Sequence, residues 1–142
     1  MKRKMISFVT LLVMVIFSAF CLVACGGGTA AAEVVETTDT LVVIRVEKTD
    51  EEATLFDVME ALQEDNALQF ELSGTMLKSL NGTENASDFS SCWMLYTSDN
   101  AMGNSEWGTY DYNGTSCLSA ILGGDALTVS AGAYYVWVYQ TF

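Results

Sequence analysis

Hydrophobic residues from position 40 onward fall in short stretches separated by glycine, asparagine and aspartate. Apolar and polar residues that alternate between such turn-forming residues predict β-strands. The segment 41–46 (LVVIRV) is apolar at almost every position, so we expect a strand buried on both faces in the centre of a sheet. Further strands are predicted at 68–72, 76–80, 92–96, 110–112, 115–117, 126–129 and 133–141.

One stretch has the residue spacing of a helix. Thr54 is a good N-cap residue with Asp57 three positions later, and apolar residues recur at helical spacing between 55 and 62. We expect a helix that begins after Thr54 and ends near Asp65. A single helix among several short strands indicates an α+β fold.

Two Asn-Gly pairs predict tight turns between strands. Asn81-Gly82 follows the strand at 76–80, and Asn113-Gly114 separates two short β-patterned segments. Asn-Gly suits the positive φ angles of a type I′ hairpin turn. In the register that such a turn imposes on the second pair, Tyr110 lies opposite Cys117.

The last strand carries a row of aromatic residues. Tyr135, Trp137 and Tyr139 share one face, and Val136 and Val138 share the other. We expect the valines to pack on the helix and the aromatic row to face outward, where it could stack a planar ligand. The alternative is that these rings are ordinary strand residues packed beneath the loop at 98–109.

Three more rings lie in a polar, glycine-containing segment. Trp107, Tyr110 and Tyr112 are additional candidates for ligand contacts, because binding residues are often found in such segments. The alternative is a loop held in place by its own aromatic side chains.

The first residues have the pattern of an export signal. Three cations at positions 2–4 precede an apolar run from 5 to 24. The run ends in Leu-Val-Ala-Cys at 22–25, which resembles the lipobox of bacterial lipoproteins, whose cysteine receives a lipid before cleavage. We therefore predict a signal peptide at 1–24, lipidation of Cys25 and a flexible tether over 25–39, followed by one domain at 40–142.

An uncleaved transmembrane helix is the alternative to a lipoprotein signal, because the run is close to the ~20 apolar residues that span a bilayer. The Lys/Arg cluster stays in the cytoplasm in both cases. Both interpretations place the domain on the extracytoplasmic face of the cell membrane.

Composition narrows the classes of function. Without residues 1–24, three cations (Arg45, Lys48 and Lys78) face 18 acids, which is a net charge of −15. Such a charge repels nucleic acid and anionic polymers. The chain contains no histidine, which removes the commonest general base and metal ligand. We therefore expect a non-catalytic protein that binds no nucleic acid, metal or cofactor.

Two cysteines, Cys92 and Cys117, belong to the expected domain. In an exported protein they could form one disulfide, which would stabilise the fold by about 3 kcal/mol. They could equally be two buried free thiols that pack as small apolar groups. The spacing does not decide between these alternatives.

Four segments in order resemble the transcobalamin-like C-terminal domain family: 54–62 (TLFDVMEAL), 77–82 (LKSLNG), 92–96 (CWMLY) and 124–127 (GDAL). The resemblance covers about 40–142 and implies a β-grasp-like fold, in which a mixed sheet packs on one helix. It departs from the family pattern at 97–100 (TSDN), where a Val-Asn-Gly turn is usual. The resemblance also implies a role in holding a soluble ligand.

The combined prediction is a lipid-anchored extracytoplasmic protein that binds a small soluble ligand, such as a corrinoid or a carbohydrate. The alternative is a protein-interaction module that docks on a transporter or another envelope protein. Both functions use an exposed apolar surface.

The lipidation prediction is testable on the whole chain. Cys25→Ala should abolish incorporation of radioactive fatty acid and leave the unprocessed precursor, because the lipid is attached to the cysteine sulfur. Labelling that persists in this variant would contradict the lipobox assignment.

Overall fold

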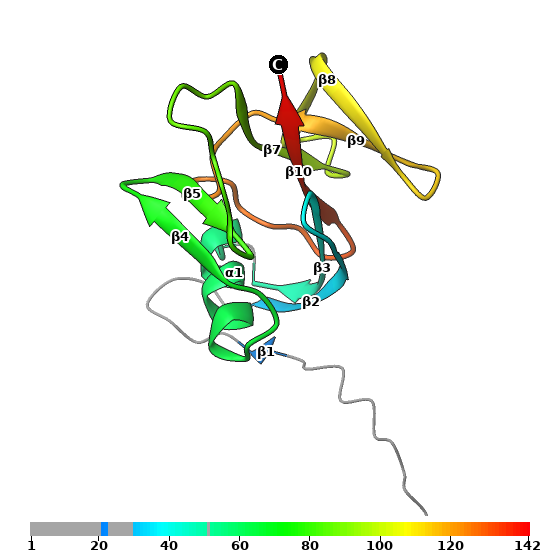
Figure 1. Cartoon of the computed structure of the whole chain (residues 1–142). Helices are drawn as coiled ribbons and strands as arrows, with labels where there is room; N and C mark the ends of the chain where they lie inside the picture. The colour runs from blue at the N-terminus through cyan, green and yellow to red at the C-terminus, as the bar shows by residue number, and fades with distance from the viewer. Residues whose placement is uncertain (1–20, 23–29, 51) are drawn as a thin grey trace, which may run out of the picture.

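The computed structural model describes residues 21–22, 30–50 and 52–142. Cys25, the predicted lipidation site, lies outside the described residues, as does most of the predicted signal peptide. Ten strands and one helix are assigned in the described part of the chain (Figure 1): β1 Cys21–Leu22, β2 Ala30–Thr37, β3 Leu41–Thr49, α1 Leu55–Glu64, β4 Phe70–Ser73, β5 Met76–Leu80, β6 Thr83–Glu84, β7 Ser91–Thr97, β8 Gly103–Tyr112, β9 Thr115–Ala120 and β10 Tyr134–Thr141.

The strands form two sheets. Seven strands are arranged in the order β1-β2-β3-β10-β7-β9-β8, and β4, β5 and β6 form a separate three-stranded sheet. Figure 1 shows α1 and the smaller sheet on one side of β10 and the β8–β9 hairpin on the other. The predominance of strands over a single short helix agrees with the α+β class. The expectation of a mixed sheet is wrong for the described residues, where every recorded strand pair is antiparallel.

The absence of parallel pairs in the described region follows from the path of the chain. A parallel pair requires a crossover connection that returns the chain to the same sheet. Here α1 follows β3 but leads into β4 of the smaller sheet. β3 is central as predicted, between β2 and β10, and its residues Val42, Val43 and Ile44 are fully buried.

The predicted tether is wrong over 30–37. These residues form β2, which pairs antiparallel with β3 so that Val34 lies opposite Ile44. Ala30, Ala31 and Ala32 are buried. The β3 backbone needs hydrogen-bond partners on both sides, and the alanines are small enough to pack close to the rest of the core. The first strand, β1, pairs with this same part of β2.

The helix prediction is confirmed in its bounds and its cap. Thr54 is the N-cap: its side chain accepts a hydrogen bond from Asp57 N (3.2 Å), and the Asp57 carboxylate accepts one from Thr54 N (2.8 Å). Asp65 is the C-cap residue. Among the described residues, no helix is long and apolar enough to cross a membrane.

The predicted hairpin at Asn113-Gly114 is also confirmed. Both residues have positive φ (49° and 83°), and Tyr110 pairs with Cys117 in the register expected for this turn. Residues 126–129 do not form the expected strand. They lie in the connection before β10. A single bridge joins Thr128 to Thr54 at the start of α1, so this segment contacts the helix N-terminus and does not join a sheet.

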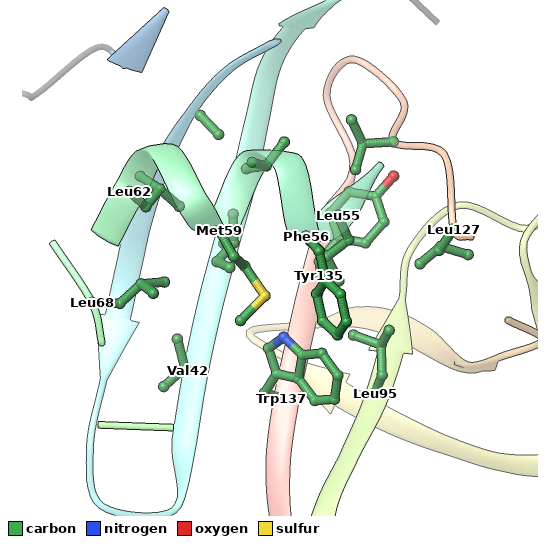
Figure 2. Close-up of a cluster of buried hydrophobic side chains, with 14 of the residues drawn as sticks. Val42, Leu55, Phe56, Met59, Leu62, Leu68, Leu95, Leu127, Tyr135 and Trp137 are labelled. Carbon is green, nitrogen blue, oxygen red and sulfur yellow. The ribbon is translucent and has the colours of Figure 1, made fainter. Parts of the chain in front are cut away.

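The two faces of β10 are the reverse of the prediction. Tyr135 and Trp137 point toward α1 and belong to the main hydrophobic core (Figure 2). Val136 packs instead in a second cluster with Tyr112 and Cys117 of the hairpin. The sequence pattern suggested one buried face, but both faces of β10 are covered, and the larger rings fill the thicker layer beneath the helix.

The capping interaction gives a test of the fold. Thr54→Ala should lower the free energy of unfolding by about 1 kcal/mol, because it removes the acceptor for an otherwise unpaired helix N–H. Thr54→Ser keeps the hydroxyl and should stay close to the wild type. Urea denaturation followed by circular dichroism measures both, and equal losses in the two variants would contradict the role of the cap.

Candidate functional site

An apolar cavity of about 280 Å³ lies between the smaller sheet and β7 of the larger one. A cavity of about 150 Å³ is large enough for benzene. Aliphatic, aromatic and sulfur-containing side chains dominate its lining, which comprises Phe56, Thr75, Met76, Leu77, Asn85, Phe89, Cys92, Trp93, Met94, Leu95, Gly123, Gly124 and Trp137.

Trp93 connects the two sheets beside this cavity. Its backbone N–H donates to Asn85 Oδ1 (2.9 Å), and its indole Nε1 donates to the Thr83 carbonyl (2.9 Å). Asn85 in turn donates from Nδ2 to the Leu77 carbonyl (2.7 Å). These bonds hold the segment after β6 against β7, so this wall of the cavity is fixed by paired polar groups.

Trp137 lines the cavity from β10 but lacks the corresponding bond. Trp137 is 5% exposed, and its Nε1 is buried with no hydrogen-bond partner among the described residues. Figure 2 shows the nitrogen-bearing edge of the ring on the side of Met59, within the core. An unpaired buried N–H destabilises the fold. Trp137 therefore stabilises the core through the packing of its ring and not through a hydrogen bond.

Two exposed apolar side chains stand at the mouth of the cavity. Met76 is 52% exposed and Phe89 is 53% exposed. Phe89 also has φ of 57°, a left-handed conformation that is costly for a bulky residue, and its N–H donates to the Ala86 carbonyl (2.9 Å). The turn therefore holds a strained aromatic residue in solvent next to an apolar cavity.

A second cavity, of about 400 Å³, is adjacent to the first. Both are lined by Met76, Leu77, Asn85 and Phe89. The second cavity is more polar, and its other lining residues are Ser73, Lys78, Glu84, Ala86 and Ser87. We call the first the inner cavity, because more of its lining residues are buried, and the second the outer cavity.

Charged side chains lie on the outer cavity. Lys78 Nζ is 3.1 Å from the Glu71 carboxylate and 3.7 Å from that of Glu84. The hydrogen bond to Glu71, with the charges of both acids, raises the pKa of Lys78. All three side chains are exposed, so these pairs contribute little to stability. Glu84 keeps most of its carboxylate open to a ligand.

Gly124 forms the wall opposite the strands. A Cβ at this position would lie 2.4 Å from the Phe56 ring, far inside contact distance. The Gly124 carbonyl also accepts a hydrogen bond from Phe56 N (2.9 Å) at the start of α1. The absence of a side chain therefore lets Phe56 occupy its place on the cavity wall.

The predicted aromatic row is divided by the structure. Tyr135 has no exposed surface, and its hydroxyl accepts a hydrogen bond from Ser130 N (2.8 Å), so its predicted role as an outward platform is wrong. Trp137 is buried too, but it lines the cavity. Tyr139 packs edge-on against Trp93 (5.4 Å between centroids) and donates to the Glu84 carbonyl (2.8 Å), which makes it a support of the cavity.

The other predicted rings lie away from this cavity. Trp107 is 63% exposed on β8. Tyr110 packs on Tyr96 (5.8 Å) and Tyr112 on Tyr134 (5.6 Å), within the cluster beneath the hairpin. Burial raises the pKa of Tyr112, and a hydrogen bond to Glu36 adds to this. Tyr110 and Tyr112 therefore pack as residues of strand β8, and neither the ligand-contact prediction nor the alternative of an anchored loop describes them.

The two domain cysteines are free thiols, so the disulfide alternative is wrong for this structure. Their strands pair only near Tyr96 and Thr97 of β7, away from Cys92. Cys117 is buried in the second cluster. Burial raises the pKa of both thiols, which disfavours the reactive thiolate at neutral pH.

The acidic side chains and thiols of the domain are dispersed. Across 21–22, 30–50 and 52–142, no three Asp, Glu or Cys side chains gather closely enough to hold a metal ion. The cavity presents ring faces, methyl groups and sulfur atoms, which bind an apolar group by burial and dispersion.

Several cavity residues were not singled out in the sequence. Met76 begins β5, and Asn85 and Phe89 lie in the connection between β6 and β7, all distant from β10 in the chain. One signal was present: Phe89 is the only aromatic residue within the polar stretch 83–91. Nothing in the sequence showed that this turn would lie beside β7.

Comparisons with known proteins give no relative for this chain. No protein family, no curated protein and no solved structure matches it. The function is therefore argued from the cavity and the sequence.

The two buried tryptophans differ in a way that can be measured. Trp93→Phe should destabilise the fold by about 1 kcal/mol more than Trp137→Phe, because only Trp93 loses an indole hydrogen bond. Both side chains are buried to a similar degree, so the loss of ring volume is comparable. Chemical denaturation of the two variants tests this, and a larger loss for Trp137→Phe would contradict the assigned hydrogen bonding.

Proposed function

We propose that this protein is a lipid-anchored, extracytoplasmic binding domain that takes up a small ligand with a single apolar ring and performs no catalysis. The observation that carries the proposal is the apolar cavity framed by Phe56, Trp93 and Trp137, with Met76 and Phe89 exposed at its mouth. Concave apolar sites with a few polar groups are the usual form of small-molecule sites.

Volume and lining favour a single ring over the ligands first considered. A corrin macrocycle joins four five-membered rings and needs more space than the inner cavity provides. A carbohydrate carries many hydroxyl groups, and burying them without partners is costly. Asn85 already uses its amide in bonds to Trp93 and Leu77. An aromatic or alicyclic group is the best fit.

The predicted anchor agrees with this role. Cys25 is five residues before Ala30, the first residue of β2, so even a fully extended connection spans at most about 17 Å. A lipid on Cys25 would therefore hold the domain close to the membrane surface. Such a position suits the capture or presentation of a ligand near the bilayer.

The family resemblance is compatible with this proposal. A sheet packed on one helix is part of the arrangement expected of a β-grasp-like domain, although the described strands pair antiparallel and not in a mixed sheet. Holding soluble ligands is the role that the transcobalamin-like resemblance implies. The cavity lining draws on each of the four resembling segments, through Phe56, Leu77, the 92–95 strand and Gly124.

Docking on an envelope protein is the second candidate. Four exposed apolar side chains favour it: Met76 and Phe89 at the cavity mouth, and Ile121 and Leu122 directly before Gly123 of the cavity wall. Exposed apolar residues close together are typical of interaction surfaces.

Filling the cavity tests ligand binding. Leu77 is buried and lines both cavities, so Leu77→Phe should weaken binding of 2-phenylethanol at least about tenfold by occupying the space. Leu72→Phe makes the same change on exposed β4, where Leu72 is absent from the lining of both cavities, and should leave binding unchanged. Tryptophan fluorescence, in a Trp107→Phe background that removes the exposed indole, follows the titration.

Near-ultraviolet circular dichroism of both variants shows whether the fold is kept. Saturable binding to the wild type and to Leu72→Phe, but not to Leu77→Phe, is the expected result. No saturable response from the wild type to ring compounds of any charge would contradict ligand binding and leave docking as the function of this surface.

A further inference from the structure

We propose that the ligand is a small amphipathic cation, whose ring occupies the inner cavity and whose ammonium group lies in the outer cavity against Glu84. This inference rests on the proposed function and adds the charge and shape of the ligand. It follows from three features: the four lining residues that the two cavities share, the acids around the outer cavity and the net charge of the domain.

The two cavities are adjacent and differ in polarity. Met76, Leu77, Asn85 and Phe89 line both, so we infer that one small molecule spans them across these shared residues. The inner cavity is bounded by rings and aliphatic groups. The outer cavity adds Ser73, Ser87, Lys78 and Glu84. A ligand that matches both parts has an apolar end and a polar end.

The charges at the outer cavity favour a positive end. Glu84 lines the outer cavity, and Glu71 is paired with Lys78, which also lines it. Asp88 directly precedes Phe89 in the turn at the mouth of the cavity. A hydrogen bond from Ser90 lowers the pKa of Asp88, so this carboxylate is ionised at neutral pH. Lys78 is the cation within this group, and it lies closer to Glu71 than to Glu84. The Glu84 carboxylate is thus the acid best placed to receive a second cation.

The charge of the whole domain also favours a positively charged ligand. The described residues include three cations, and Arg45 is paired with Glu47 in the same way that Lys78 is paired with Glu71. An excess of negative charge raises the local concentration of cations and repels anions. Phe89 lines both cavities, and its aromatic ring would also attract a cation in the outer one.

Three probes of similar shape test the charge of the ligand. 2-Phenylethylamine is a cation at neutral pH, 2-phenylethanol is neutral and phenylacetate is an anion. At low ionic strength we expect the amine to bind about threefold to tenfold more tightly than the alcohol, and the anion to bind least. Added salt should reduce the advantage of the amine but not the affinity for the alcohol.

Matched variants place the effect at Glu84. Glu84→Gln should remove most of the preference for the amine and leave the affinity for the alcohol unchanged. Glu106→Gln removes the same charge from exposed β8, outside both cavity linings, and should keep the preference. Lys78→Met removes the competing cation and should increase the affinity for the amine.

Each outcome is decisive and distinguishes this inference from the proposed function. Equal binding of amine and alcohol, or equal effects of Glu84→Gln and Glu106→Gln, would overturn the cation inference while the cavity remained a ligand site. Failure of all three probes to bind would overturn both. A preference for the amine that is lost in Glu84→Gln alone supports the inference.

Discussion

The burial of β10 on both faces is the constraint on which the rest of this structure depends. On one face, Tyr135 and Trp137 pack under α1; on the other, Val136 packs under the β8–β9 hairpin. Neither face of such a strand can be left to water without exposing large apolar side chains. The helix and the β8–β9 hairpin must therefore lie on opposite sides of β10, as Figure 1 shows.

The cavity is a consequence of this arrangement. The smaller sheet packs beside α1 but is attached to the larger sheet mainly through Trp93, Asn85 and Tyr139. Hydrogen-bonded polar groups fix the spacing between the two sheets. The side chains between the sheets do not fill all of that space, and the cavity remains. Gly124 lets the Phe56 ring form part of the cavity wall, because a Cβ at this position would lie 2.4 Å from that ring. The same interactions that join the sheets thus define the cavity that we propose as the ligand site.

The position of the domain relative to its predicted anchor changes how the site is used. With 30–37 in a strand rather than in a tether, the connection to Cys25 is short. In the proposed arrangement, a cavity held near the membrane on a domain with many acids and few cations would be suited to collecting small positively charged molecules from the adjacent solution. The raised pKa of the Cys92 thiol and the mostly apolar lining of the cavity favour the proposed binding role.

Local signals determined much of this protein from its sequence alone. The capping pair Thr54 and Asp57 defined the start of the helix, and Asn113-Gly114 defined the hairpin register, because these interactions join residues within a few positions of each other. Alternation in β10 correctly separated the rings from the valines. Which of these two faces meets the helix depended on tertiary structure, since both faces are apolar and only the packing of distant elements distinguishes them. The strand at 30–37 likewise required β3 as a partner, and the cavity required turns that are far from β10 in the chain to pack beside it.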